Sequence, residues 1–162
     1  TRQALSGAGW RLLYDEEALA GNVNPLIPGE EEKLIAELKY LLGMEIPVIA
    51  SCNRVPEKDG HFVSCGVEVS RETSYEEVQR LMQIPTLDLP SSPELVNNII
   101  EGTPTRDEHL WIGEGMTTTV GNIRVDGNII RFDALSHNTV RGAAGGVILL
   151  AEFAVDESYI TK

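Results

Sequence analysis

Basic residues are scarce in this 162-residue chain, where 13 lysines and arginines stand against 25 aspartates and glutamates and the formal net charge is −12. A nucleic-acid binder needs clustered positive charge to meet phosphates, and the sequence has no such cluster. Apolar runs are short, and none approaches the roughly 20 residues that span a bilayer. The first residues, Thr1–Leu5, lack the features of a signal peptide. We therefore expect a cytoplasmic protein that binds neither nucleic acid nor a membrane.

Cysteine occurs only at Cys52 and Cys65, which provides neither a disulfide framework nor the spacing of a metal site. We predict that both thiols are small core residues of a reduced protein and that no metal is bound. The alternative is that Cys52, two residues from Arg54, acts as a nucleophile. A reactive thiolate needs electropositive surroundings, and neither cysteine has a basic residue directly beside it in the sequence.

The local patterns predict an α+β fold with a mainly antiparallel mixed sheet and helices packed on one face. A leucine stripe behind an acidic first turn predicts a helix over 30–42. A capping box at Ser74–Glu77 predicts a second helix that continues to Met82. The spacing of Leu95–Ile100 is compatible with either a helix or a strand.

Two further patterns lie in the C-terminal half of the sequence. The segments Met116–Val125 and Asn128–Ala134 flank Asp126-Gly127, a pair typical of a type I′ hairpin. The last apolar segment contains several glycines, each of which costs a helix about 1 kcal/mol relative to alanine. We therefore predict a terminal helix over 138–153 that packs closely against another surface.

An arginine and a histidine bracket the turn-forming segment 55–60. The flanking segments 46–54 and 61–70 both alternate like half-buried strands. If they pair as a hairpin, Arg54 lies opposite His61 with Cβ atoms about 5 Å apart. A guanidinium beside an imidazole at the edge of an apolar face favours an acidic ligand between them. The alternative is that both side chains simply reach water at the strand ends.

Four motifs occur in order along the chain: Gln3–Gly9, Gly29–Lys33, Cys52–Pro56 followed by Asp59–His61, and Leu135–Gly146. Together they resemble the C-terminal catalytic and dimerisation domain of aspartate-semialdehyde dehydrogenase, of the archaeal and fungal type. The resemblance implies one domain over 1–155 that includes the terminal helix, with a tail over 156–162. It also implies a fold like that of the C-terminal domain of glyceraldehyde-3-phosphate dehydrogenase.

The family reduces aspartyl 4-phosphate with NADPH to aspartate semialdehyde through a thioacyl enzyme, in lysine, threonine and methionine biosynthesis. In the family the nucleophilic cysteine belongs to an N-terminal dinucleotide-binding domain, and this sequence contains neither that cysteine motif nor a Gly-rich fingerprint. We expect this chain to be the catalytic half of such an oxidoreductase and to be inactive when it is isolated. Its partners would be that N-terminal Rossmann domain, which would bind most of the NADP, and a second copy in a dimer formed through the sheet.

The resemblance also implies roles for individual residues. An imidazole suits proton transfer to a thiol, and a guanidinium suits a carboxylate. For Glu30 and Lys33 the alternative is a solvated helix start, and for Asn138 it is helix capping. The implied roles are acid/base catalysis by His61; orientation of the reacting carbonyl by Gln3; binding of the substrate carboxylate by Arg54, its amino group by Glu30 and its phosphate by Lys33; and NADP contacts by Ser6, Gly7, Gly9 and Asn138.

The sequence departs from the family in two places. After Gly9 the family continues with a Tyr-Pro-Gly-like turn, whereas Trp10–Asp15 follows here, and Thr103–Asp107 only loosely resembles the family's equivalent. Two other functions remain open. Archaeal malonyl-CoA reductase resembles the same family, but its substrate has no amino group for Glu30 to bind. A non-catalytic dimerisation module is the second alternative.

Overall fold

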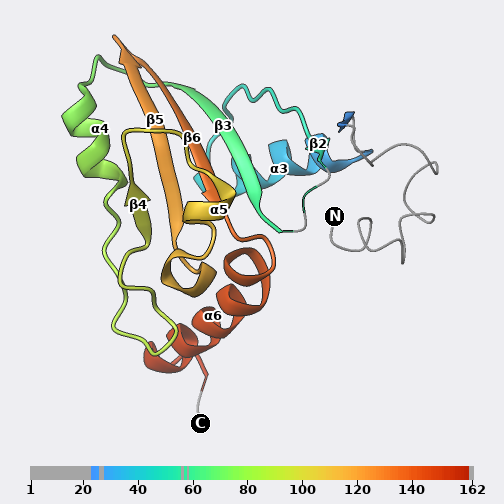
Figure 1. The fold of residues 1–162 in the computed structure, drawn as a ribbon, viewed down its shortest axis with the longest axis vertical. Coiled ribbons are helices and arrows are strands. Elements are labelled where there is room, and N and C mark those ends of the chain that lie inside the picture. Colours follow the sequence, from blue (N-terminus) through green and yellow to red (C-terminus); the bar gives the residue numbers. More distant parts are fainter. Residues whose placement is uncertain (1–22, 26–27, 56, 58, 161–162) are drawn as a thin grey trace. The chain divides into compact units, whose positions relative to one another are not determined.

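The computed structural model describes residues 23–25, 28–55, 57 and 59–160. Element labels follow Figure 1. The chain divides into two compact units, Thr1–Lys58 and Asp59–Lys162, and each is described by itself.

The first unit is built on helix α3 (Glu30–Leu42), which has the bounds that the sequence predicts. The flanking residues Gly29 and Gly43 are both left-handed, with φ values of 78° and 61°. Such a glycine is a common helix C-terminus because it carries no Cβ to clash. Three glutamates occupy the first turn, where the helix dipole favours negative charge.

A chain segment with alternating burial follows α3. The side chains of Ile46, Val48, Ala50, Cys52 and Arg54 are half-buried, and the residues between them are exposed. This confirms the predicted alternation. Only the end of the segment joins a ladder, in which β2 (Asn53–Arg54) pairs antiparallel with β1 (Asn24–Pro25).

The second unit contains a four-stranded sheet in the order β3-β6-β5-β4 (Figure 1). The β3–β6 and β5–β6 pairs are antiparallel, and the β4–β5 pair is parallel. The mainly antiparallel α+β fold is thus confirmed, and the ambiguous segment Leu95–Ile100 contains a strand. The strands are β3 (His61–Glu68), β4 (Asn97–Ile99), β5 (Thr118–Asp126) and β6 (Ile129–Ser136).

The hairpin that would place Arg54 opposite His61 is wrong. Arg54 pairs with Asn24 in the first unit, and His61 pairs with Ser136 in the second. The reason is that β6 is a longer pairing partner, because all eight residues of β3 pair with residues of β6. Strands that follow one another in sequence often pair, but here a distant strand provides the longer ladder.

The β5–β6 hairpin is confirmed, with its turn one residue later than predicted. Asp126 pairs with Ile129, which leaves Gly127 and Asn128 as the loop. Gly127 has a φ of 60°, whereas Asn128 is not among the residues with positive φ. A glycine at the first loop position with φ above zero is typical of a type II′ turn rather than type I′.

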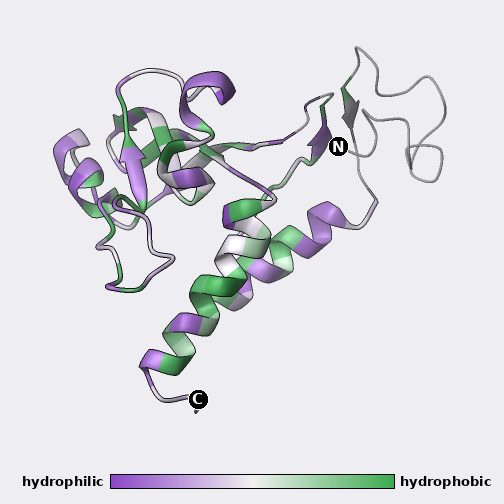
Figure 2. Ribbon diagram, turned by 60° about the horizontal axis from the view of Figure 1, so that its bottom comes forward, coloured by the Kyte–Doolittle hydropathy of each residue, from purple (hydrophilic) through white to green (hydrophobic). Residues whose placement is uncertain are grey.

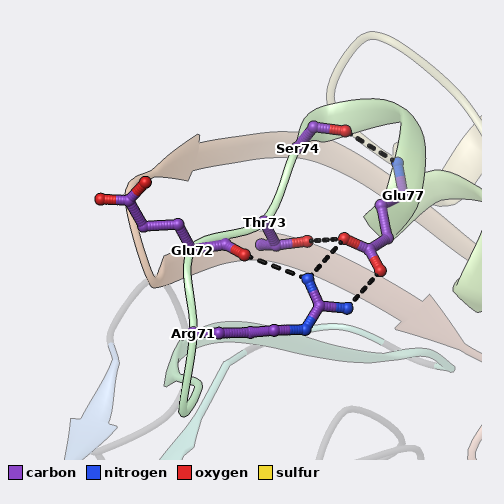
Figure 3. Close-up of polar contacts among 5 residues, drawn as sticks. All are labelled: Arg71, Glu72, Thr73, Ser74 and Glu77. Carbon is purple, nitrogen blue, oxygen red and sulfur yellow. Dashed lines mark hydrogen bonds and ion pairs between the residues drawn. The ribbon is translucent and has the colours of Figure 1, made fainter.

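Helix α4 (Tyr75–Met82) covers one face of the sheet. Its Val78 packs with Val120 and Ile123 of β5 to form the buried core of this face. The predicted cap is confirmed, since the Ser74 side chain accepts a hydrogen bond from the Glu77 N–H at 3.2 Å. Figure 3 shows how Arg71 and Thr73 also donate hydrogen bonds to the Glu77 carboxylate.

The terminal helix is interrupted rather than continuous over 138–153. A π-helical segment η2 (Val140–Ala144) precedes α6 (Gly145–Asp156), and Ala143 within η2 has non-helical angles of φ −146° and ψ −105°. The glycines around this break explain it, because they weaken the helix. No residue of α6 is buried, although Figure 2 shows the helix coloured mostly as hydrophobic. Among the described residues, no helix combines the length and apolar character needed to cross a membrane.

Candidate functional site

The predicted site residues divide among three parts of the chain. Gln3, Ser6, Gly7 and Gly9 lie outside the described residues. Arg54, Glu30 and Lys33 lie in the first compact unit, and His61 and Asn138 lie in the second.

In the first unit, the three predicted substrate-binding residues come from two connected elements. The backbone N–H of Cys52 donates to Oε1 of Glu31 at 2.9 Å, and this bond ties the segment that carries Arg54 to the first turn of α3. That first turn carries Glu30 and Lys33, which are both exposed. The half-buried guanidinium of Arg54 thus belongs to a segment that is hydrogen-bonded to the first turn of α3, where Glu30 is negative and Lys33 is positive.

Neither of the described cysteines has the surroundings of a nucleophile. Desolvation raises the pKa of the Cys52 thiol, and Glu31, Glu30 and Glu32 raise it further by their negative charge. Burial also raises the pKa of the Cys65 thiol, with a smaller contribution from Asp133. A raised pKa leaves less thiolate, which is the reactive form. The prediction that these cysteines are inert is therefore favoured over a role for Cys52 in catalysis.

In the second unit, His61 is the first residue of β3, and its side chain is exposed. Strand β3 lies at the edge of the sheet formed by the described residues, where β6 is its neighbour. The imidazole therefore stands, exposed, at the beginning of an edge strand of that sheet.

The peptide that joins Asp59 to Gly60, one residue before His61, is hydrogen-bonded by side chains at both of its polar groups. The N–H of Gly60 donates to Oδ1 of Asn138 at 2.9 Å, and Nε of Arg106 donates to the carbonyl oxygen of Asp59 at 3.1 Å. These two groups belong to the same peptide. Gly60 has a φ of 117°, a backbone conformation that favours glycine.

The residue beside Asn138 anchors it in the fold. His137 is 1% exposed, and its ring meets that of Trp111 edge to face, with the centroids 4.4 Å apart. Its Nδ1 lies 3.3 Å from Oγ1 of Thr139, while its Nε2 has no hydrogen-bond partner among the described residues. The capping alternative for Asn138 is not observed, because Thr139 precedes η2 and Oδ1 of Asn138 binds Gly60 instead.

No pattern in the sequence indicates that Arg106 binds the chain just before His61. The two residues are 45 positions apart, and Arg106 lies in the segment that departs from the family pattern. It is presented by the short helix α5 (Arg106–His109). The available signal was the Asp59-Gly60 pair, because Asp-Gly often marks a turn, but it does not say which distant side chains bind that turn.

Asn138 is the one described residue that the resemblance assigns to NADP. With Oδ1 engaged by Gly60, its amide is oriented so that Nδ2 remains as a donor. An amide donor suits the carboxamide oxygen of a nicotinamide, so the residue fits that group. In the described part of the chain, no group of three or more histidine, cysteine, aspartate or glutamate side chains is placed to hold a metal ion.

Comparison with known proteins places the chain and its fold in a family. The family model described as the semialdehyde dehydrogenase dimerisation domain matches residues 1–141. The chain belongs to this family. Aspartate-semialdehyde dehydrogenase of Archaeoglobus fulgidus is 44% identical over 172 residues, which cover 98% of this chain and 50% of that protein.

Two other members of the semialdehyde dehydrogenase family are informative. Malonyl CoA reductase (NADP) of Metallosphaera sedula is 32% identical over 183 residues, covering 100% of this chain and 51% of that protein. The crystal structure of aspartate semialdehyde dehydrogenase with NADP from Candida albicans superimposes with a TM-score of 0.73 at 29% identity, covering 91% of this chain and 48% of that one. The chain thus spans about half the length of these relatives, in agreement with the C-terminal domain that its sequence resembles.

Proposed function

We propose that this chain is the catalytic C-terminal half of an NADP-dependent aspartate-semialdehyde dehydrogenase of amino-acid biosynthesis. The enzyme would convert aspartyl 4-phosphate to aspartate semialdehyde and phosphate in the cytoplasm. The observation that carries the proposal is the exposed imidazole of His61 at the start of β3, one residue after a peptide whose two polar groups are both hydrogen-bonded by side chains. The 44% identity to the Archaeoglobus fulgidus enzyme supports the choice of substrate.

In this reaction His61 moves a proton at sulfur. A ring nitrogen of His61 takes the proton of a cysteine thiol on the N-terminal domain, and the thiolate then displaces phosphate from the acyl phosphate to form a thioester. NADPH, when bound, supplies the hydride that reduces this thioester. The imidazolium then gives its proton to the former carbonyl oxygen of the thioester, which forms a hemithioacetal. The imidazole takes this proton back as the carbon–sulfur bond breaks and the aldehyde is released. An imidazole suits both directions because it titrates near neutral pH.

The first unit would bind the polar groups of the substrate. Arg54 would donate two parallel hydrogen bonds to the α-carboxylate, a geometry that a guanidinium provides better than an ammonium group. Glu30 would pair with the substrate amino group. Lys33 would bind the phosphate at the start of α3, where free backbone N–H groups and the helix dipole also favour an anion.

The partner of the chain would be the N-terminal Rossmann domain of the same enzyme, which would supply the nucleophilic cysteine and most of the NADP site. The apolar helix α6, of which no residue is buried, supports a large covered surface in the complete enzyme. A homodimer would form through the sheet, and the family's description as a dimerisation domain supports the formation of a dimer.

The test is reconstitution. The chain is mixed with the N-terminal half of the Archaeoglobus fulgidus relative, and NADPH formation is followed at 340 nm with aspartate semialdehyde, phosphate and NADP. We expect no turnover from either half alone and turnover from the mixture. Turnover by the chain alone would assign the chemistry to Cys52 or Cys65. Stable association of the halves without turnover would instead favour a non-catalytic dimerisation module.

The second candidate is an acyl reductase that acts on malonyl-CoA, and the 32% identity to the Metallosphaera sedula enzyme favours it. The two substrates differ at the amino group that Glu30 would bind. We expect the reconstituted enzyme to prefer aspartyl phosphate. Glu30→Gln should weaken the binding of aspartyl phosphate and leave the rate of any malonyl-CoA reduction unchanged. A Glu30→Gln variant with unaltered aspartate-semialdehyde turnover would contradict the role of Glu30.

A further inference from the structure

Two side chains from distant parts of the sequence form hydrogen bonds to one peptide group, Asp59–Gly60, which lies one residue before His61. Arg106 donates a hydrogen bond to the carbonyl oxygen of Asp59, 47 residues earlier in the chain. Asn138 accepts a hydrogen bond from the N–H of Gly60, 78 residues earlier. A peptide needs only one partner on each polar group, so these two bonds complete its hydrogen bonding. The peptide is thus fixed by side chains where a regular strand would use a neighbouring strand.

Both gripping side chains are anchored. Arg106 opens α5, which leads into Leu110, and Leu110 is 1% exposed. Asn138 follows His137, which is also 1% exposed and whose carbonyl accepts a hydrogen bond from the N–H of Gly142 at 3.1 Å. Because buried neighbours hold the backbone at both ends, neither bond can shift without moving the core.

The position of the gripped peptide matters for His61. Strand β3 lies at the edge of the sheet, and its ladder with β6 begins with the pair His61 and Ser136. Among the described residues, no strand of the second unit's sheet lies beside the chain before this pair. An edge of this kind frays unless other contacts hold it. The bonds from Arg106 and Asn138 act on the peptide just before the residue where fraying would begin.

We propose that Arg106 and Asn138 are positioning residues, which clamp the Asp59–Gly60 peptide so that the imidazole of His61 is presented in one orientation for proton transfer. This inference rests on the proposed acid/base role of His61. It adds a function for Arg106, and for Oδ1 of Asn138 it adds one that is separate from any contact that Nδ2 makes with NADP.

Matched substitutions separate the hydrogen bond from the bulk of each side chain. In Arg106→Gln the amide nitrogen lies the same number of bonds from Cα as Nε does, so the donor is kept without the charge. In Arg106→Met a methyl group takes that place and the donor is lost. Asn138→Asp keeps an acceptor for the Gly60 N–H, whereas Asn138→Leu keeps the shape without any acceptor.

The first measurement uses the 162-residue chain without substrate. Hydrogen exchange of the Gly60 amide, followed by NMR, is expected to accelerate about tenfold or more in Arg106→Met and Asn138→Leu, because this amide then opens locally. Exchange of the core amides of β5 should stay unchanged, which shows that the fold is intact. In Arg106→Gln the Gly60 amide should be protected again. Unchanged protection in both deletion variants would overturn the clamp.

The second measurement is kcat in the enzyme reconstituted with the N-terminal half, at saturating substrate and NADP. A misplacement of about 1 Å can cost on the order of 100-fold, so we expect Arg106→Met to lower kcat by about 10- to 100-fold with KM little changed. Arg106→Gln should recover most of this loss. The Asn138 variants also lose the Nδ2 donor assigned to NADP, so their test is the exchange of the Gly60 amide. An Arg106→Gln variant as slow as Arg106→Met would overturn the assignment of the Arg106 hydrogen bond.

The two measurements distinguish failure of this inference from failure of the proposed function. If His61→Ala leaves turnover intact, the acid/base role is wrong, whatever the exchange data show. If His61→Ala abolishes turnover while Arg106→Met keeps full kcat, the acid/base role stands and the positioning role is overturned.

Discussion

Replacing Gly60 with alanine should destabilise the second unit through the backbone and not through crowding. A methyl group on Gly60 would lie 3.6 Å from Cδ1 of Leu110 and 3.7 Å from Cδ1 of Leu135, which are ordinary contact distances. The φ of 117°, however, is a conformation that residues with a Cβ rarely adopt. Such backbone strain costs about 1–3 kcal/mol. Alanine also restricts the unfolded chain, which offsets about 0.4–1 kcal/mol of this.

We therefore expect Gly60→Ala to lower the free energy of unfolding by about 1–2 kcal/mol. The matched control is Gly66→Ala in β3, the strand that begins directly after Gly60; there a methyl group would meet no atom within 4 Å and φ is not positive. There the change should be neutral or slightly stabilising.

The assay is urea denaturation followed by tryptophan fluorescence, and Trp111 lies in the same unit as both glycines. The midpoint should fall for Gly60→Ala while the slope of free energy against urea stays the same. Thermal scans should show a lower Tm by about 2–8 °C. Equal midpoints for Gly60→Ala and Gly66→Ala would refute the argument that the backbone before His61 is held in a strained conformation.

Three further predictions concern the α4 cap and the substrate site. Ser74→Ala removes the acceptor for the Glu77 N–H and should cost about 0.5–1 kcal/mol in urea denaturation, and a change below 0.2 kcal/mol would show that the cap is unimportant. Hydrogen bonds from Arg71 and then Thr73 lower the pKa of Glu77 from its ordinary 4.5 to about 2, so this interaction stabilises the fold above pH 4.5 and is lost as the pH falls toward 2. Arg71→Met should therefore lower the urea midpoint at pH 6 but hardly at pH 2, whereas an equal loss at both values would contradict the ionic origin. Arg54→Lys in the reconstituted enzyme should raise KM for aspartate semialdehyde about tenfold, because lysine lacks the planar fork, and an unchanged KM would argue against carboxylate binding.

Local signals in the sequence predicted the elements that depend on neighbouring residues. The acidic first turn and leucine stripe gave the bounds of α3, and the Ser74 capping box gave the start of α4. The β5–β6 hairpin was also predictable, because its turn is encoded within a few residues. The shift to a Gly127-Asn128 loop followed from pairing of Asp126 with Ile129, which a dipeptide signal alone does not determine.

Pairings between distant segments could not be predicted in the same way. The alternation of residues 61–68 showed that they form a strand, but not that β6 would be the partner. The same limit applies to the candidate site. His61 and Asn138 were identified from motifs, whereas the bonds of Arg106 and Asn138 to the Asp59–Gly60 peptide join residues 47 and 78 positions apart. Such contacts depend on the assembled fold. The roles of the site residues in catalysis stay predictions.

The acid/base role of His61 is tested most directly by kcat of His61→Ala in the reconstituted enzyme, measured beside the unaltered chain with aspartate semialdehyde, phosphate and NADP. A positioned acid/base group contributes about 10²- to 10⁴-fold to the rate, so we predict a loss in that range with KM largely retained. A loss of less than tenfold would remove His61 from the proton transfer and contradict the proposed mechanism.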